Sequence, residues 1–155
     1  MSERRRGLLV VGAALLVVVA VATGLASSAL AASSGATRLT VRSTEFGKAV
    51  FGPNGKVVYA FGADRGTTSR CYGVCAAAWP PVLTKAPPLA GSGVEAKLLG
   101  TTKRKNGTLQ VTYGGHPLYY YVADTKPGQL SGQGLNQFGA PWWALSAAGT
   151  ENHHV

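Results

Sequence analysis

The stretch GKVVYAFGAD (residues 55–64) returns sixty residues later in the chain as GHPLYYYVAD (residues 115–124). In both copies a tyrosine is followed two residues later by an aromatic residue and five residues later by an aspartate. Self-similarity at a fixed offset is the sequence signature of a repeat architecture, in which each copy is one structural unit. The chain therefore predicts a domain made of two related halves, residues 38–84 and 97–149.

The same offset aligns further residues of the two halves. It pairs Tyr59 with Tyr119, Phe61 with Tyr121 and Asp64 with Asp124, and Trp79 corresponds to Trp142 after an insertion of three residues. The Pro- and Gly-rich segment KAPPLAGSG (85–93) joins the halves. Units of about fifty residues bury too little surface to be stable alone, so we expect the two halves to share one small core.

Short-range signals indicate β-structure. Asn54-Gly55 lies between the apolar runs KAVF and KVVYAF, and such a dipeptide is a strong hairpin signal because both turn positions need positive φ. In the second half, two further turn signals separate three short strand-like runs, which predicts a three-stranded meander. Side chains alternate along a strand, so Tyr59 and Phe61 should share a face. The predicted class is all-β, with a sandwich or barrel-like core.

One short helical turn is expected around residues 75–78, because Pro80 and Pro81 would stop any longer helix there. These prolines follow Trp79 directly.

The N-terminus has the order of an export signal. Three arginines at 4–6 precede the uncharged stretch Gly7–Ala26, and the small-x-small pattern Ala29-Leu30-Ala31 follows. We expect residues 1–31 to be a cleaved signal peptide, with a retained membrane-anchor helix as the alternative because twenty apolar residues can span a bilayer. Both place the folded part outside the cytoplasm. Residues 32–37 are expected to be a linker and 150–155 a disordered tail.

The exported part is strongly basic. After Ala31 the chain carries twelve Lys and Arg against five Asp and Glu. Such a balance favours anionic partners, and outside the cytoplasm these are acidic envelope polymers or the membrane surface rather than nucleic acid. The alternative is that the charge only keeps a secreted domain soluble. The cluster Lys103–Lys105 is expected at a hairpin tip, either solvated or in contact with acidic polymer.

The chain has two cysteines, in CYGVC (71–75). Haem attachment and a thioredoxin-like site are excluded because both need two intervening residues. An even cysteine count in an exported protein favours a Cys71–Cys75 disulfide. Cysteines four apart on a regular helix are too distant for a disulfide, so we expect a loop around Gly73 that presents Trp79. The alternative is a Cu(I) site of Cys71, Cys75 and His116, because soft thiolates select that ion. No other cofactor or metal is predicted.

The doubled Tyr-x-aromatic-x-x-Asp motif resembles a family of bacterial secreted-repeat lipoproteins whose function is uncharacterised. The resemblance extends over nearly the whole exported chain, through the two cysteines with Trp79-Pro80-Pro81, QVTYGGHPLYYY (110–121), GQG (132–134) and Trp142-Trp143. It implies an exported, envelope-associated β protein. Many members carry a lipid-modified cysteine at the signal cleavage site, whereas SSALAASSGA (27–36) has none. Secretion or a retained helix takes the place of a lipid anchor here.

The motif residues have two interpretations. Asp64 and Asp124 could meet across a pseudo-twofold axis for acid–base chemistry or metal binding, but we favour bonds from each carboxylate to the turn that follows it. The aromatic residues could form a sugar-stacking platform, but they are more often core. Adjacent strand residues face opposite sides, so one of Trp142 and Trp143 should be buried and the other available to a partner or glycan.

These patterns predict a non-enzymatic binding or structural protein of the cell envelope. A copper-binding or redox accessory protein is the alternative, and an enzyme comes third, because the sequence contains no recognisable nucleophile–base arrangement.

Overall fold

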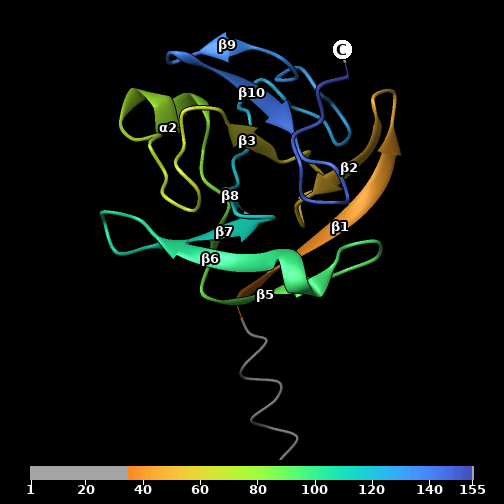
Figure 1. The fold of residues 1–155 in the computed structure, drawn as a ribbon, viewed down its shortest axis with the longest axis horizontal. Coiled ribbons are helices and arrows are strands. Elements are labelled where there is room, and N and C mark those ends of the chain that lie inside the picture. Colours follow the sequence, from red (N-terminus) through yellow and green to blue (C-terminus); the bar gives the residue numbers. More distant parts are fainter. Residues whose placement is uncertain (1–34, 155) are drawn as a thin grey trace, which may run out of the picture.

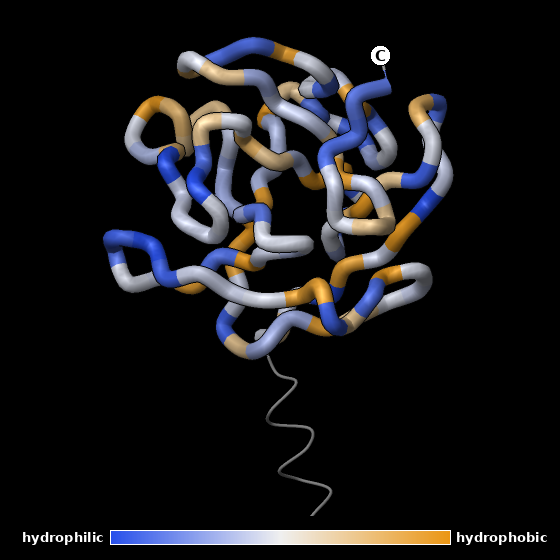
Figure 2. The backbone as a smooth tube through the Cα atoms, in the orientation of Figure 1, coloured by the Kyte–Doolittle hydropathy of each residue, from blue (hydrophilic) through white to orange (hydrophobic). Residues whose placement is uncertain are grey.

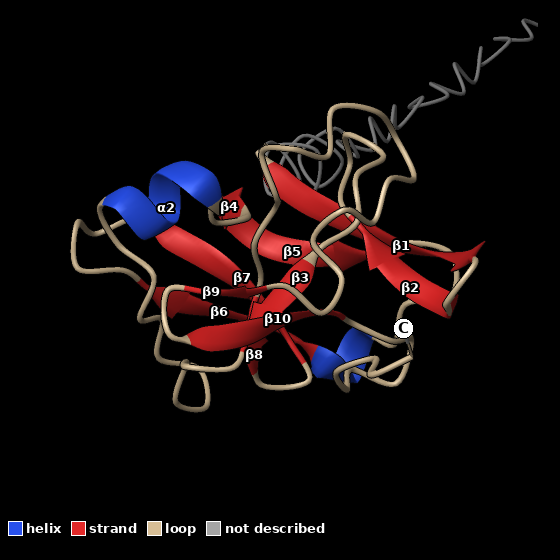
Figure 3. Cartoon of the chain, turned by 90° about the horizontal axis from the view of Figure 1, so that it is seen from above, coloured by secondary structure: helices blue, strands red, loops and turns tan. Residues whose placement is uncertain are grey.

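The structure is a computed structural model that describes residues 35–154, so the expected signal or anchor segment lies outside the described residues. The fold is mostly β-strand with little helix (Figure 1; Figure 3). The elements are β1 (Ala36–Thr44), β2 (Gly47–Phe51), β3 (Tyr59–Phe61), α2 (Val74–Ala78), β4 (Leu83–Thr84), β5 (Ala86–Ala90), a 3-10 helix (Ala96–Leu98), β6 (Leu99–Lys103), β7 (Leu109–Tyr113), β8 (His116–Pro117), β9 (Asn136–Gln137) and β10 (Ala140–Ala144). Within residues 35–154, no helix has the length and hydrophobicity to cross a membrane.

The strands form three small sheets, with strand orders β2-β1-β5, β3-β10-β9 and β4-β7-β6, and β8 adds to β7. The all-β class is confirmed, and so is the meander of β6, β7 and β8, whose neighbours pair antiparallel. The barrel-like alternative is wrong, because the sheets of the described part stay open. Most strands have only two to five residues, too few for the tilted, staggered register that closes a barrel.

Strand β3 lies at the centre of the core and is buried on both faces. Tyr59 and Phe61 pack into one apolar cluster, as the alternation predicts. Val58 and Ala60 point the other way into a second cluster, which includes Leu118 from the other half. Both clusters draw residues from both halves, so the two repeats share one core.

The two repeats meet at a pair of equivalent tyrosines. The backbone N–H of Tyr59 donates to the carbonyl of Tyr119 at 2.8 Å, and the N–H of Tyr119 donates back to the carbonyl of Tyr59 at 3.0 Å. A reciprocal antiparallel pair of equivalent residues is the contact expected on a twofold axis. This pair therefore marks the pseudo-twofold axis of the domain.

Each repeat gives its last strand to the other. Strand β4 of the first half pairs with β7 of the second, while β10 of the second half pairs with β3 of the first. Next to these strands, Val82 donates its N–H to Leu118, and Leu145 donates its N–H to Val58. The halves are interlocked, because two of the three sheets combine strands from both of them.

Three joining or terminal segments differ from expectation. Strand β1 already begins at Ala36, inside the predicted linker, and the Pro-rich connection contains β5, which pairs in parallel with β1. At the end of the chain, Glu151 forms a bridge with Leu145, and buried Asn152 donates its side-chain amide to the carbonyl of Phe46 at 2.6 Å. These residues satisfy backbone groups at the ends of neighbouring strands, so they belong to the fold rather than to a disordered tail.

A single repeat is expected not to fold alone. A chain of residues 97–154 lacks the segment at Val82 that pairs with Leu118, which leaves backbone groups unpaired and core surface exposed. Thermal melts and amide NMR spectra should show an unfolded chain, and mixing with residues 35–96 should restore the cooperative transition of the intact protein. A lone repeat with a cooperative melt would contradict the interlocked description.

Candidate functional site

The Tyr and Asp of the repeated motif bond across the two halves. The hydroxyl of Tyr59 donates to Asp124 Oδ2 at 2.7 Å, and the hydroxyl of Tyr119 donates to Asp64 Oδ2 at 2.9 Å. Each tyrosine thus reaches the aspartate of the other repeat rather than its own. The motif spacing thus places one Tyr–Asp hydrogen bond on each side of the pseudo-twofold axis.

The second oxygen of each aspartate holds the loop that follows it. Asp64 Oδ1 accepts the backbone N–H of Arg70 at 2.7 Å, and Asp124 Oδ1 accepts that of Ser131 at 2.9 Å. Bonds from each carboxylate to the turn directly after it were expected, whereas the bonded N–H groups lie six and seven residues further along the chain. The carboxylates serve different tyrosines and different loops, so this geometry does not assemble them into an acid–base pair.

The two copies differ in exposure. Asp124 is fully buried, whereas Asp64 is half-buried. Partial burial raises the pKa of Asp64 to about 6, against the lowering effect of hydrogen bonds from Arg70 and Tyr119. Burial raises the pKa of Tyr59 and of Tyr119 well above the usual value, so both hydroxyls stay protonated and act as donors.

Four aromatic rings stack in the order Phe61, Trp142, Trp79, Tyr121. The centroids of successive rings are 4.1, 3.9 and 4.2 Å apart, and successive rings come alternately from the first and the second repeat. Tyr59 and Tyr119 meet the tryptophans edge-on. Both tryptophans are completely buried, which makes this stack core rather than a platform for sugars.

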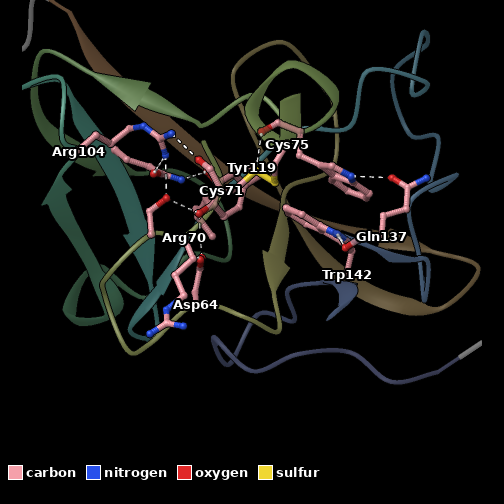
Figure 4. The surroundings of a disulfide bond; sticks show 12 residues. Asp64, Arg70, Cys71, Cys75, Arg104, Tyr119, Gln137 and Trp142 are labelled. Atoms are coloured by element: carbon pink, nitrogen blue, oxygen red, sulfur yellow. Dashed lines mark hydrogen bonds between the residues drawn. A yellow bond between two sulfur atoms is a disulfide. The ribbon is translucent and has the colours of Figure 1, made fainter. Parts of the chain in front are cut away.

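A single glutamine holds both indole rings in place. Trp79 donates its Nε1–H to the side-chain oxygen of Gln137 at 2.9 Å, and Trp142 donates to the backbone carbonyl of Gln137 at 3.1 Å (Figure 4). Gln137 could not be predicted from the repeated motif, because it lies outside the motif and has no counterpart in the other repeat. Trp143 faces away from the stack, half-buried against His153, as the strand alternation predicts.

Gly132, in the GQG segment, packs against the stack. A Cβ at this position would lie 2.6 Å from the ring of Trp79, so only glycine fits without a shift of the indole. Pro80 and Pro81 follow helix α2, and they lead the chain back to the axis. The carbonyl of Pro80 accepts the N–H of Tyr120 at 2.8 Å, and Pro81 bridges to Tyr119.

The Cys71–Cys75 disulfide is confirmed. It is not wholly in a loop, because Cys75 lies in helix α2 while Cys71 precedes the helix. Between them Gly73 has φ of +57°, a conformation that glycine adopts without strain, and it turns the chain into the helix. The expected loop rested on the fact that two cysteines four residues apart on one regular helix are too distant to bond. Only Cys75 lies on the helix here, so that restriction does not apply.

The disulfide loop is tied to the tip of the β6–β7 hairpin by a buried arginine (Figure 4). Arg104 is only 5% exposed, and its guanidinium donates to the carbonyl of Cys71 at 2.6 Å, to Ser69 at 2.9 Å and to Gln110 at 2.6 Å. Ser69 in turn bonds the hydroxyl of Tyr119. Arg104 was expected to be solvated with its lysine neighbours, and the Lys-Arg-Lys run carries no signal that its middle residue turns inward.

The copper alternative concerns cysteines whose sulfurs are bonded to each other here. His116 lies on β8 and lines a separate cleft of about 340 Å³ with Asp64 and Glu151. Among residues 35–154, no three His, Cys, Asp or Glu side chains are grouped to hold a metal ion. A copper site would therefore first require reduction of the disulfide, so it stays a hypothesis about a reduced state.

Replacing Tyr59 with Phe should destabilise the fold by about 1–3 kcal/mol, because it leaves the buried carboxylate of Asp124 without its hydroxyl donor. Tyr121→Phe is the matched control, since it keeps the stacked ring and should change the free energy of unfolding by less than about 0.5 kcal/mol. Chemical denaturation of both variants measures the difference. Equal effects would show that the cross-repeat bond contributes nothing to stability.

The raised pKa of Asp64 predicts a pH-dependent stability. The pKa of Asp64 in the folded protein, about 6, lies above its ordinary value of 3.8, so the stabilising contribution of the protonated group is complete below about pH 3.8. It is lost as the pH rises through about 6. Relative to Asp64→Asn, the free energy of unfolding of the natural protein should fall between pH 4 and 6, as measured by urea titration. Parallel profiles would contradict the shift.

Comparison with known proteins places the chain in a family. Two stretches, residues 40–83 and 100–146, match the family described as a secreted repeat of unknown function, and together they cover more than half of the chain. No curated protein and no solved structure matches it. The matched stretches correspond to the two interlocked halves, and the chain belongs to this family of secreted repeats, of which it carries two copies.

Proposed function

We propose that this exported protein is a non-enzymatic component of the cell envelope that binds anionic polymers through its basic surface. The observation that carries the proposal is an excess of cationic side chains without carboxylate partners. Within residues 35–154, Lys97 is the one Lys or Arg that forms a salt bridge, with Glu95 at 2.9 Å. A surface with so much uncompensated charge attracts polyanions over long range.

The most concentrated charge lies at the tip of the β6–β7 hairpin, which Figure 2 shows as a strongly hydrophilic part of the chain. Lys103 and Lys105 are exposed there on either side of buried Arg104. Tyr72 of the disulfide loop lies beneath them, with its ring centroid 4.4 Å from the Arg104 guanidinium carbon and 5.0 Å from Lys105 Nζ. The bonds of Arg104 hold the tip in one place, so less conformational entropy is lost when a ligand binds.

A binding role is supported over catalysis by what the polar motif residues do. The tyrosine hydroxyls and both carboxylates are engaged in bonds between the repeats, and these bonds hold the fold together. Such groups are not available as general acids or bases without loss of the inter-repeat contact. The side chains of Lys103 and Lys105 form no hydrogen bonds between the repeats, so they can bind a ligand without disturbing the fold.

Binding to inorganic polyphosphate tests the proposal, with neutral dextran as the uncharged control polymer. The protein should bind polyphosphate but not dextran, and the affinity should fall steeply as salt is raised to about 0.15 M, where the Debye length is about 8 Å. Fluorescence anisotropy with a labelled polymer measures both quantities.

A matched pair of double variants locates the binding. Lys103→Glu with Lys105→Glu should weaken binding by about tenfold or more, equivalent to about 1.4 kcal/mol. Lys48→Glu with Lys56→Glu makes the same change of net charge on and beside β2 and should have a smaller effect. Binding that is absent, or that does not respond to salt, would refute the proposal.

A further inference from the structure

An apolar groove lies between strand β4 and the tip of the β6–β7 hairpin. It has a volume of about 580 Å³ and a mostly apolar lining, formed by Gly35, Leu83, Thr84, Lys85, Gly107 and Leu109 among others. Leu83 stands 46% exposed at this groove. Concave sites with a mostly apolar lining and a few polar groups are the usual places where proteins bind ligands.

The chain enters the domain at this groove. Gly35 is the first described residue, and its carbonyl accepts the N–H of Lys85, another lining residue, at 3.0 Å. In the sequence, only eight residues separate the end of the uncharged stretch Gly7–Ala26 from Gly35. Eight residues span at most about 29 Å when fully extended, so a membrane-embedded stretch would keep this end of the domain close to the bilayer.

The charges at the groove have one sign. Lys85 lines it, and exposed Lys103 lies directly opposite Leu109 in the register of β6 and β7. None of its lining residues is acidic. An apolar floor beside lysines fits an anionic amphiphile, whose acyl region meets the leucines while its phosphates meet the ammonium groups.

We propose that this groove docks on a bilayer surface that contains anionic phospholipid. Leu83 and Leu109 enter the boundary between headgroups and acyl chains, and Lys85 and Lys103 contact the lipid phosphates. The inference rests on the proposed function, since it accepts an exported protein with anionic partners, and it adds the lipid surface as the partner of this face. With the groove on the membrane, the opposite side of the domain faces away from the bilayer.

Hydrogen exchange on the full chain in lipid vesicles tests the docking. The chain is reconstituted into neutral phosphatidylcholine vesicles and into vesicles containing phosphatidylglycerol, so any insertion of the N-terminal stretch is common to both. Peptides covering residues 83–88 and 104–110 should exchange about tenfold more slowly in the anionic vesicles when lipid is about tenfold above its apparent Kd. Leu83→Ser and Lys85→Glu should each abolish this protection, and Lys56→Glu, a charge change away from the groove, should retain it.

The outcomes separate this inference from the proposed function, because soluble polyphosphate binding is measured on the same variants. Leu83→Ser should leave polyphosphate binding unchanged while losing lipid protection. Equal exchange in both vesicle types, with polyphosphate binding intact, would overturn the docking and spare the proposed function. Protection that survives Leu83→Ser but is lost in Lys85→Glu would mean charge attraction without groove insertion, which also overturns it.

Discussion

The fold depends on one contact, the reciprocal backbone pair between Tyr59 and Tyr119 on the pseudo-twofold axis. This pair brings the same strand of each repeat side by side, and each tyrosine side chain then reaches the aspartate of the other repeat. The stacked tryptophans and the exchanged strands β4 and β10 follow the same symmetry. The hydroxyls and carboxylates of the repeated motif therefore serve to bond the two repeats to each other.

If symmetry accounts for the core, the function should lie where the two halves differ. The disulfide, Ser69 and Arg104 form a connected group at one end of the domain that has no equivalent at the other. This group supports the hairpin tip with its exposed lysines, and the β4–β7 side adds an apolar groove to it. Half-buried Asp64, unlike its fully buried counterpart Asp124, belongs to the same asymmetric side, because Tyr119 connects it to Ser69.

Much of this architecture could be predicted from the sequence, because the sixty-residue offset indicates two copies and their size requires a shared core. The alternation around Tyr59, the meander around the turn at Asn106 and the disulfide could also be predicted from local patterns. The exchange of strands was not, since an internal repeat aligns each residue with its counterpart but says nothing about its partner. Strand β5 could not be predicted because it contains two prolines, which usually indicate a loop. An edge strand tolerates them because it need not donate every N–H. Arg104 and Gln137 were missed because their bonds depend on loops that only the tertiary structure brings together.

Native-state hydrogen exchange tests most directly whether the two repeats form one cooperative unit around the tyrosine pair. The amides of Tyr59, Tyr119, Val82 and Leu145 all donate across the interlocked strands, so opening any of them should require global unfolding. All four amides should exchange with the same free energy, equal to that of complete unfolding. If the amides of one repeat exchanged at a distinctly lower free energy while those of the other stayed protected, the repeats would be independent units and would not be held together by the tyrosine pair.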